Sequence, residues 1–100
     1  MKLIFKTNTY GFHIEITNPL IARKLKDSLP WDSNVVKYND SICFNMYTLD
    51  VALEDPSLCA KKGDVIWNYS NSSLCIYLGL PDAEQKGTPS KGIKAGRILA

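Results

Sequence analysis

The stretch that decides the fold is residues 63–79, which read GDVIWNYSNSSLCIYLG. Two apolar runs, residues 65–67 and 74–78, lie on either side of a segment rich in Asn and Ser. Asn and Ser favour turns because their side chains bond to nearby backbone groups. The second run is continuously apolar, which is typical of a strand covered on both faces. These residues predict two strands joined by a turn.

The residues on either side add more short strands. Residues 12–16 alternate between apolar and polar side chains, which predicts a strand with one buried face and places His13 on the face away from the core. A turn containing Asn8 and Gly11 joins this strand to the apolar run 3–6, so the two form a hairpin. Further strands are expected at residues 35–38, 41–45, 49–53 and 93–99, and a mobile loop is expected at residues 81–92.

One helix is expected between residues 18 and 30. Asn18 is a good N-cap, and Pro19 suits the first helical position, where its missing N–H costs nothing. Pro30 disfavours helical geometry at the preceding residue and ends the segment. The apolar side chains fall on one face at helical spacing: Leu20, Ile21, Leu25 and Leu29. About ten residues of amphipathic helix fit here.

Length and composition describe one soluble domain spanning residues 1–100. Apolar residues make up 45% and charged residues 22%, close to the average for globular domains. No apolar run approaches the length needed to cross a membrane, and the N-terminus lacks the apolar stretch of a secretory signal, so a cytoplasmic protein is expected. A net charge of +2 is too weak to predict nucleic-acid binding.

The three cysteines do not form a metal site by their spacing. Cys43 and Cys75 lie within apolar runs, where thiols usually act as small buried hydrophobes, and no CxxC pair occurs. A structural zinc site needs four Cys or His ligands at short paired spacings, and His13 is the one other candidate. Neither a metal nor a cofactor is therefore expected.

The second half of the chain carries a pattern with a family resemblance. Gly63-Asp64-Val65, an aromatic strand, a polar turn and then residues 74–79 followed by Pro81 resemble the small prokaryotic cyclophilin-like proteins. The resemblance extends to the hairpin through residues 40–44 and to residues 96–98. It departs at residues 67–71, where the family has a Tyr-Trp-Pro-Pro-Gly turn.

The resemblance implies a mostly β fold, a closed antiparallel β-barrel with one short helix at one end. Closure would remove unpaired sheet edges, and alternation along the strands would fill the interior with side chains. Gly63 would permit the tight turn into a strand, and Asp64 would accept hydrogen bonds from the N–H groups of that turn. The pattern of elements alone predicts an all-β barrel or sandwich, with an α+β fold as the alternative.

The function favoured by the residues and the resemblance together is that of a non-enzymatic binding module. An aromatic-lined cleft would take a small molecule or a peptide, because aromatic walls with polar tips are usual in such sites. The alternative is that these side chains simply fill the barrel. Strands that expose aromatic or Ile side chains also favour a homodimer. The candidate ligand-binding residues are Phe44, Asn45, Tyr47, Trp67 and Tyr77.

Two enzymatic alternatives remain open at this point. Peptidyl-prolyl isomerisation is suggested by the family name, but Phe12-His13-Ile14 lacks the arginine that true cyclophilins use to polarise the prolyl amide. A hydrolase or lyase would need acid, base and nucleophile to converge. The residues available for that are His13, Glu15, Asp64 and Cys75.

Overall fold

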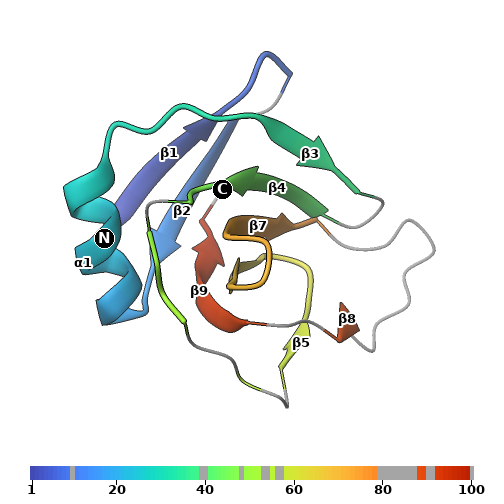
Figure 1. Ribbon diagram of the computed structural model, residues 1–100. Coiled ribbons are helices and arrows are strands. Elements are labelled where there is room, and N and C mark those ends of the chain that lie inside the picture. The colour runs from blue at the N-terminus through green and yellow to red at the C-terminus, as the bar shows by residue number, and fades with distance from the viewer. Residues whose placement is uncertain are drawn as a thin grey trace.

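The structure is a computed structural model that describes residues 1–9, 11–38, 41–47, 49–52, 55, 58–78, 88–89 and 92–99. Within these ranges the chain forms one helix and nine strands (Figure 1). Their bounds are β1 (Lys2–Lys6), β2 (Gly11–Ile16), α1 (Pro19–Ser28), β3 (Val35–Lys37), β4 (Ser41–Asn45), β5 (Cys59–Ala60), β6 (Asp64–Asn68), β7 (Ser73–Tyr77), β8 (Thr88–Pro89) and β9 (Ile93–Ile98). The predicted first hairpin and the strand pair around residues 69–72 are confirmed.

Seven strands form one antiparallel sheet in the order β1-β2-β9-β6-β7-β4-β3, and β5 pairs separately with β8. The sheet curls into an open half-barrel (Figure 1), whose edge strands are β1 and β3. The expected closed barrel is therefore wrong, since no strand among the described residues joins the two edges. Side chains of β1 and β4 meet across the gap instead: the rings of Phe5 and Phe44 stack with centroids 4.5 Å apart.

The last strand, β9, lies in the middle of the sheet between β2 and β6. Its pairing with β6 is shifted between Val65 and Ile66, so that Ala95 bulges out of the ladder. The carbonyl oxygen of Ala95 accepts the N–H groups of Thr17 and Asn18, at 2.8 and 3.1 Å, which links the bulge to the start of α1.

The helix begins as the sequence predicts. The side-chain oxygen of Asn18 accepts the N–H groups of Leu20 and Ile21, at 3.1 and 3.2 Å. The helix covers one end of the half-barrel (Figure 1) and buries Ile21 and Leu25 in the core, as its apolar face predicts. With ten residues, α1 is too short to span a membrane, and it is the one helix among the described residues.

The core lies on the concave face of the sheet, with Trp67 fully buried within it. The indole N–H of Trp67 donates to the carbonyl oxygen of Val51 at 2.7 Å. The strand predicted at residues 49–53 is wrong for residues 49–52, which pair with no strand, while Leu53 lies outside the described residues. Leu49 and Val51 are buried all the same, so their alternation reflects an irregular segment packed on the core. Of the loop predicted at residues 81–92, only residues 88, 89 and 92 are described.

Cys43 and Cys75 form a disulfide between β4 and β7. The two residues are direct cross-strand partners, with Cα atoms 4.0 Å apart, and both are buried. The prediction of buried sulfur is confirmed, but the prediction of two separate thiols is wrong. The pairing depends on strand register, which places two cysteines 32 residues apart side by side.

Candidate functional site

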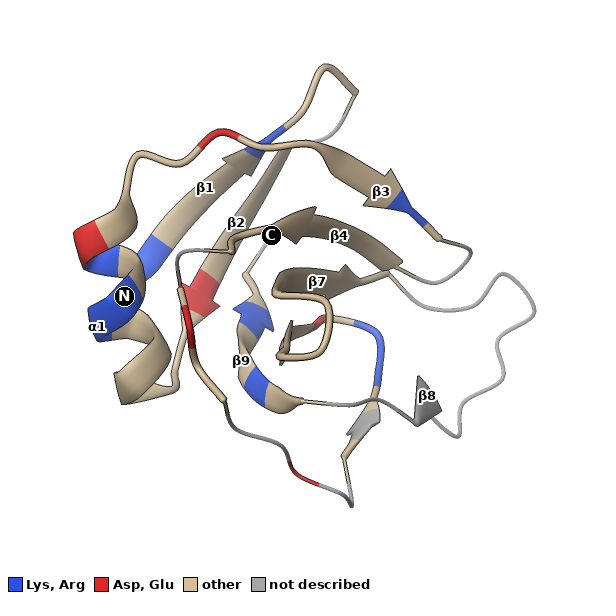
Figure 2. Cartoon of the chain, viewed as in Figure 1, with Lys and Arg blue, Asp and Glu red and all other residues tan. Residues whose placement is uncertain are grey.

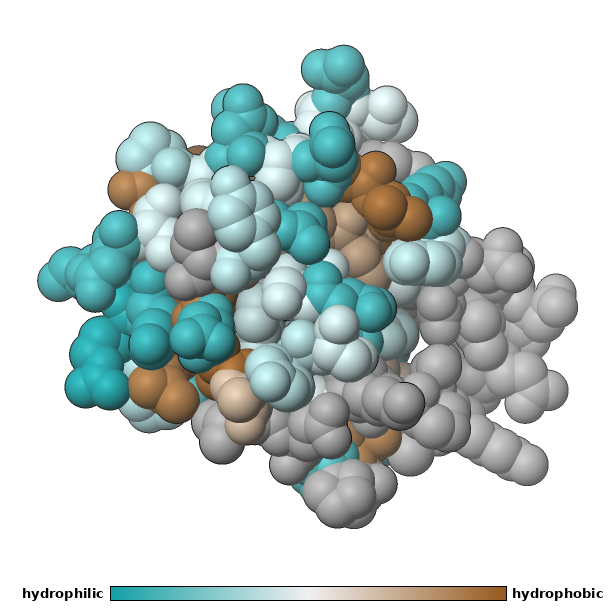
Figure 3. Space-filling view, in the orientation of Figure 1, coloured by the Kyte–Doolittle hydropathy of each residue, from teal (hydrophilic) through white to brown (hydrophobic). Residues whose placement is uncertain are grey.

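A cleft of about 120 Å³ lies at the seam between β1 and β3. Its walls come from β1, β2, α1, the segment joining α1 to β3, β3 itself, β4 with the residue that follows it, and β7. Figure 3 shows hydrophobic side chains emerging over β3 among hydrophilic neighbours, where Val35 and Val36 are exposed. The lining residues are mostly apolar: Leu3, Ile4, Phe5, Lys6, Ile14, Leu25, Leu29, Trp31, Asp32, Ser33, Val35, Phe44, Met46 and Leu74.

Phe5 of β1 and Phe44 of β4 give the cleft an aromatic wall, and Phe12 of β2 packs against Phe5 without lining the cleft. Phe5 is the cross-strand partner of Phe12, so both side chains lie on the concave face, with ring centroids 5.9 Å apart. Phe44 of β4 completes the stack against Phe5. These contacts anchor β1 to β4 across the seam although the two strands share no hydrogen bonds.

Trp31 also lines the cleft, and Asn45 and Tyr47 hold its ring in place. Its indole N–H donates to the carbonyl oxygen of Asn45 at 2.7 Å, and the ring of Tyr47 meets it edge-on with centroids 5.4 Å apart. The side-chain oxygen of Asn45 accepts the N–H of Tyr47 at 3.1 Å, which fixes the turn that carries both residues. The polar residues at the end of β4 therefore position Trp31.

The five predicted ligand-binding residues do not form one wall. Phe44 lines the cleft, and Asn45 and Tyr47 support Trp31 from outside it. Trp67 belongs to the core, and Tyr77 lies beside a separate, larger and more open hollow with Lys62 and Leu99, at the start of β6 and the ends of β7 and β9. The reason is strand alternation: along β7, Leu74 and Ile76 face the core, so Tyr77 faces away from it.

Sequence reasoning missed the residues that make most of the cleft, above all Phe5, Leu29 and Trp31. For Phe5 a signal was present, because the hairpin register predicts that it shares the concave face with Phe12. For Trp31 the signal was a large aromatic side chain in an otherwise polar connection, residues 32–34. A large aromatic side chain in a polar loop usually packs against other side chains.

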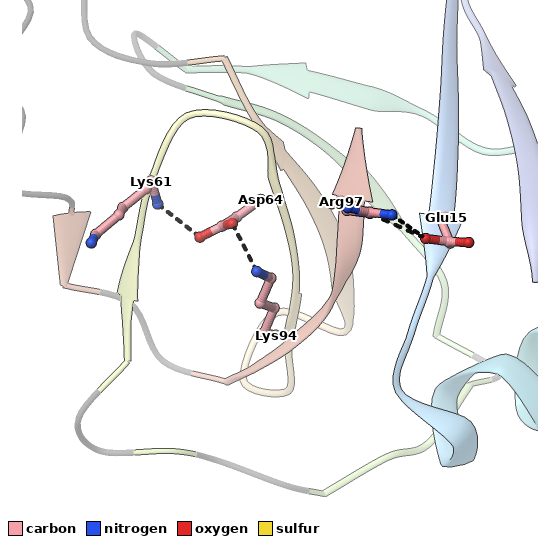
Figure 4. A network of polar contacts seen from close by, with 5 residues as sticks. All are labelled: Glu15, Lys61, Asp64, Lys94 and Arg97. Carbon is pink, nitrogen blue, oxygen red and sulfur yellow. Dashed lines mark hydrogen bonds and ion pairs between the residues drawn. The ribbon is translucent and has the colours of Figure 1, made fainter. Parts of the chain in front are cut away.

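None of the four candidate catalytic residues lines the cleft. Figure 4 shows that Glu15 and Asp64 are engaged elsewhere: Arg97 Nη2 lies 3.0 Å from Glu15 Oε1, and Lys94 Nζ lies 3.3 Å from Asp64 Oδ1. Asp64 Oδ2 also accepts the N–H of Lys61 at 3.0 Å, so its predicted role in the turn is confirmed.

The other two candidates are also placed apart from the cleft. His13 is exposed, as predicted, and Cys75 is bonded to Cys43. Across the part of the chain that the structure describes, no three His, Cys, Asp or Glu side chains gather closely enough to hold a metal ion. No family model, curated protein or solved structure significantly matches this chain.

Proposed function

We propose that this chain is a binding module whose site is the seam cleft, and that the cleft takes one small apolar group. The observation that carries this proposal is an apolar cavity of about 120 Å³ placed where the half-barrel is open. A cavity of ~150 Å³ lined by Leu, Ile and Phe holds a benzene molecule, whereas drug-sized ligands occupy roughly 300–1,000 Å³. The cleft therefore fits a single ring or branched aliphatic group.

The lining supports binding rather than catalysis. Its titratable side chains are Lys6 and Asp32, one at each side of an apolar interior. The isomerase alternative requires an arginine at the site, and both arginines of the chain lie elsewhere: Arg97 pairs with Glu15, and Arg23 is on the exposed face of α1. Binding by shape and apolar contact is the activity that these residues favour.

The cyclophilin-like relationship is part of the same proposal. What supports it is a mostly antiparallel β fold with one helix, and a turn in which Gly63 has φ +91° and Asp64 bonds back to Lys61. The open seam departs from the barrel of that family. A cytoplasmic location also stays a prediction, and the Cys43–Cys75 bond weighs against a permanently reducing environment, where disulfides are rare.

A titration with benzene, followed by two-dimensional amide NMR, tests the proposed site. We expect saturable shifts at the cleft-lining residues, and loss of those shifts in Val35→Phe, because Val35 lines the cleft and a larger ring would occupy it. Val36→Phe is the matched control, since Val36 is the next residue of β3, is exposed and does not line the cleft.

The benzene titration can support or overturn the proposed site. Saturable binding to the wild type and to Val36→Phe, with none to Val35→Phe, supports the proposal. Absence of saturable shifts in a well-folded wild-type sample, or equal binding to both variants, would overturn it. Thermal unfolding of both variants shows whether each retains the fold.

A further inference from the structure

The outer edge of β1 presents main-chain groups that no strand covers within the described residues. Met1 and Ile16 exchange hydrogen bonds in both directions, at 2.8 and 3.3 Å. Because such pairs alternate along an antiparallel ladder, Leu3 and Phe5 also point their N–H and C=O groups at β2. The main-chain groups of Lys2, Ile4 and Lys6 therefore point outward, toward the seam.

The cleft opens along this same edge. Ile4 and Lys6 of β1 line one side of it, and Val35 of β3 lines the other. A strand laid against β1 would alternate its side chains between the two faces of the sheet. A side chain opposite Phe5 would point to the concave face, which is the face of the cleft, and the cleft has room for about one such side chain.

The charges along β1 define what could lie beside it. Lys2 and Lys6 flank Ile4 on the outer face, and all three are exposed, Ile4 by 61%. Figure 2 shows Lys or Arg at both ends of β1 and at the end of β3, whereas the acidic residue of the joining segment is Asp32. Cross-strand neighbours of opposite charge stabilise a pair of strands, and like charges destabilise it.

We infer that the occupant of the seam is an extended peptide that adds a strand to the outer edge of β1. This inference rests on the proposed function of the cleft. Its five central residues run acidic, apolar, apolar, apolar, acidic. The acidic side chains lie opposite Lys2 and Lys6, the middle apolar side chain covers Ile4, and one neighbouring apolar side chain enters the cleft. The main chain supplies affinity by pairing with β1, and the alternate side chains supply specificity.

The test uses a capped, fluorescently labelled peptide with the central sequence glutamate-leucine-valine-leucine-glutamate and measures its binding by fluorescence anisotropy. Ile4→Pro removes the outward N–H without touching the ladder to β2, so we expect affinity to fall about five- to tenfold. Ile4→Thr is the comparison variant at the same position: it keeps the N–H and a β-branched side chain, so the loss of affinity in Ile4→Pro beyond that in Ile4→Thr measures the main-chain bond.

Two further comparisons address charge and main-chain pairing. When both glutamates of the peptide are replaced by lysine, binding to the wild type is expected to weaken. Lys6→Glu is expected to bind this lysine peptide more tightly than the wild type does. Methylating the peptide amides that face β1 is expected to abolish binding, whereas methylating those that face away is not.

The benzene titration separates failure of this inference from failure of the proposed function. If benzene binds the wild type and Ile4→Pro while the peptide binds neither, the cleft is a site but its occupant is not a strand. Equal peptide affinity for Ile4→Pro and Ile4→Thr overturns the inference as well. Self-association in sedimentation that Ile4→Pro abolishes, with no peptide binding, would instead identify the occupant as a second copy of this chain.

Discussion

Removing the Cys43–Cys75 disulfide is expected to lower the free energy of unfolding by about 3.7 kcal/mol. The bond closes a loop between residues 32 apart in sequence. In the chain-entropy description, a loop of that length restricts the unfolded chain by roughly 12 cal/mol/K, which gives this value at 25 °C. Since a small domain is stable by only about 5–15 kcal/mol, the bond accounts for a large share of the total.

Urea unfolding followed by far-UV circular dichroism measures the effect, with and without reductant. With an m-value of about 1.2 kcal/mol/M, the midpoint of the oxidised protein is expected to lie about 3 M above that of the reduced protein. The double variant Cys43→Ala with Cys75→Ala is expected to show no response to reductant. The variant Cys59→Ala keeps the disulfide and is expected to keep the full response.

Alkylation provides the independent check on the bond itself. In denaturant without reductant, Cys43 and Cys75 are expected to resist iodoacetamide, and after reduction both are expected to be modified, as read by peptide mapping. A midpoint that reductant shifts by less than about 0.5 M, or alkylation of both residues before reduction, would refute the reasoning.

Substitutions at three further positions test a close backbone approach, the helix cap and a buried hydrogen bond, each by urea or thermal unfolding. Gly96→Ala is expected to cost about 2 kcal/mol or more, because a Cβ there would lie 1.9 Å from the carbonyl oxygen of Glu15, and a variant as stable as the wild type would exclude this close approach. Asn18→Ala is expected to cost about 1 kcal/mol through loss of the helix cap, and Asn18→Ser to restore most of it. Trp67→Phe is expected to cost about 1–3 kcal/mol because it leaves the buried carbonyl of Val51 without its donor, and an unchanged midpoint would show that this bond contributes nothing.

Local features were predictable from the sequence because they depend on neighbouring residues. The cap at Asn18, the first hairpin and the strand around Phe44 all follow from spacing and turn chemistry. The error at residues 49–52 has a local cause too: alternation of buried and exposed side chains arises in any extended segment packed on a core, and it does not require a paired strand.

The rest depends on contacts between distant residues, which spacing does not encode. Whether β1 meets β3 is decided by the curvature of the whole sheet, so closure could not be predicted from either strand. The disulfide likewise needs the register of β4 on β7. The prediction of the site failed for the same reason. Aromatic content pointed to Trp67 and Tyr77, but strand alternation places Trp67 in the core and Tyr77 on the opposite face of the sheet.

The central position of β9 has a consequence for how the molecule is made. Until residues 93–98 leave the ribosome, the hairpin of β1 and β2 has no strand to connect it to β6, and the two parts of the sheet stay separate. During that interval both β2 and β6 present bare edges, which are the surfaces by which nascent chains stick to one another. A chain that lacks residues 93–98 would therefore hold two unfinished half-sheets with bare edges, and it would be prone to aggregate.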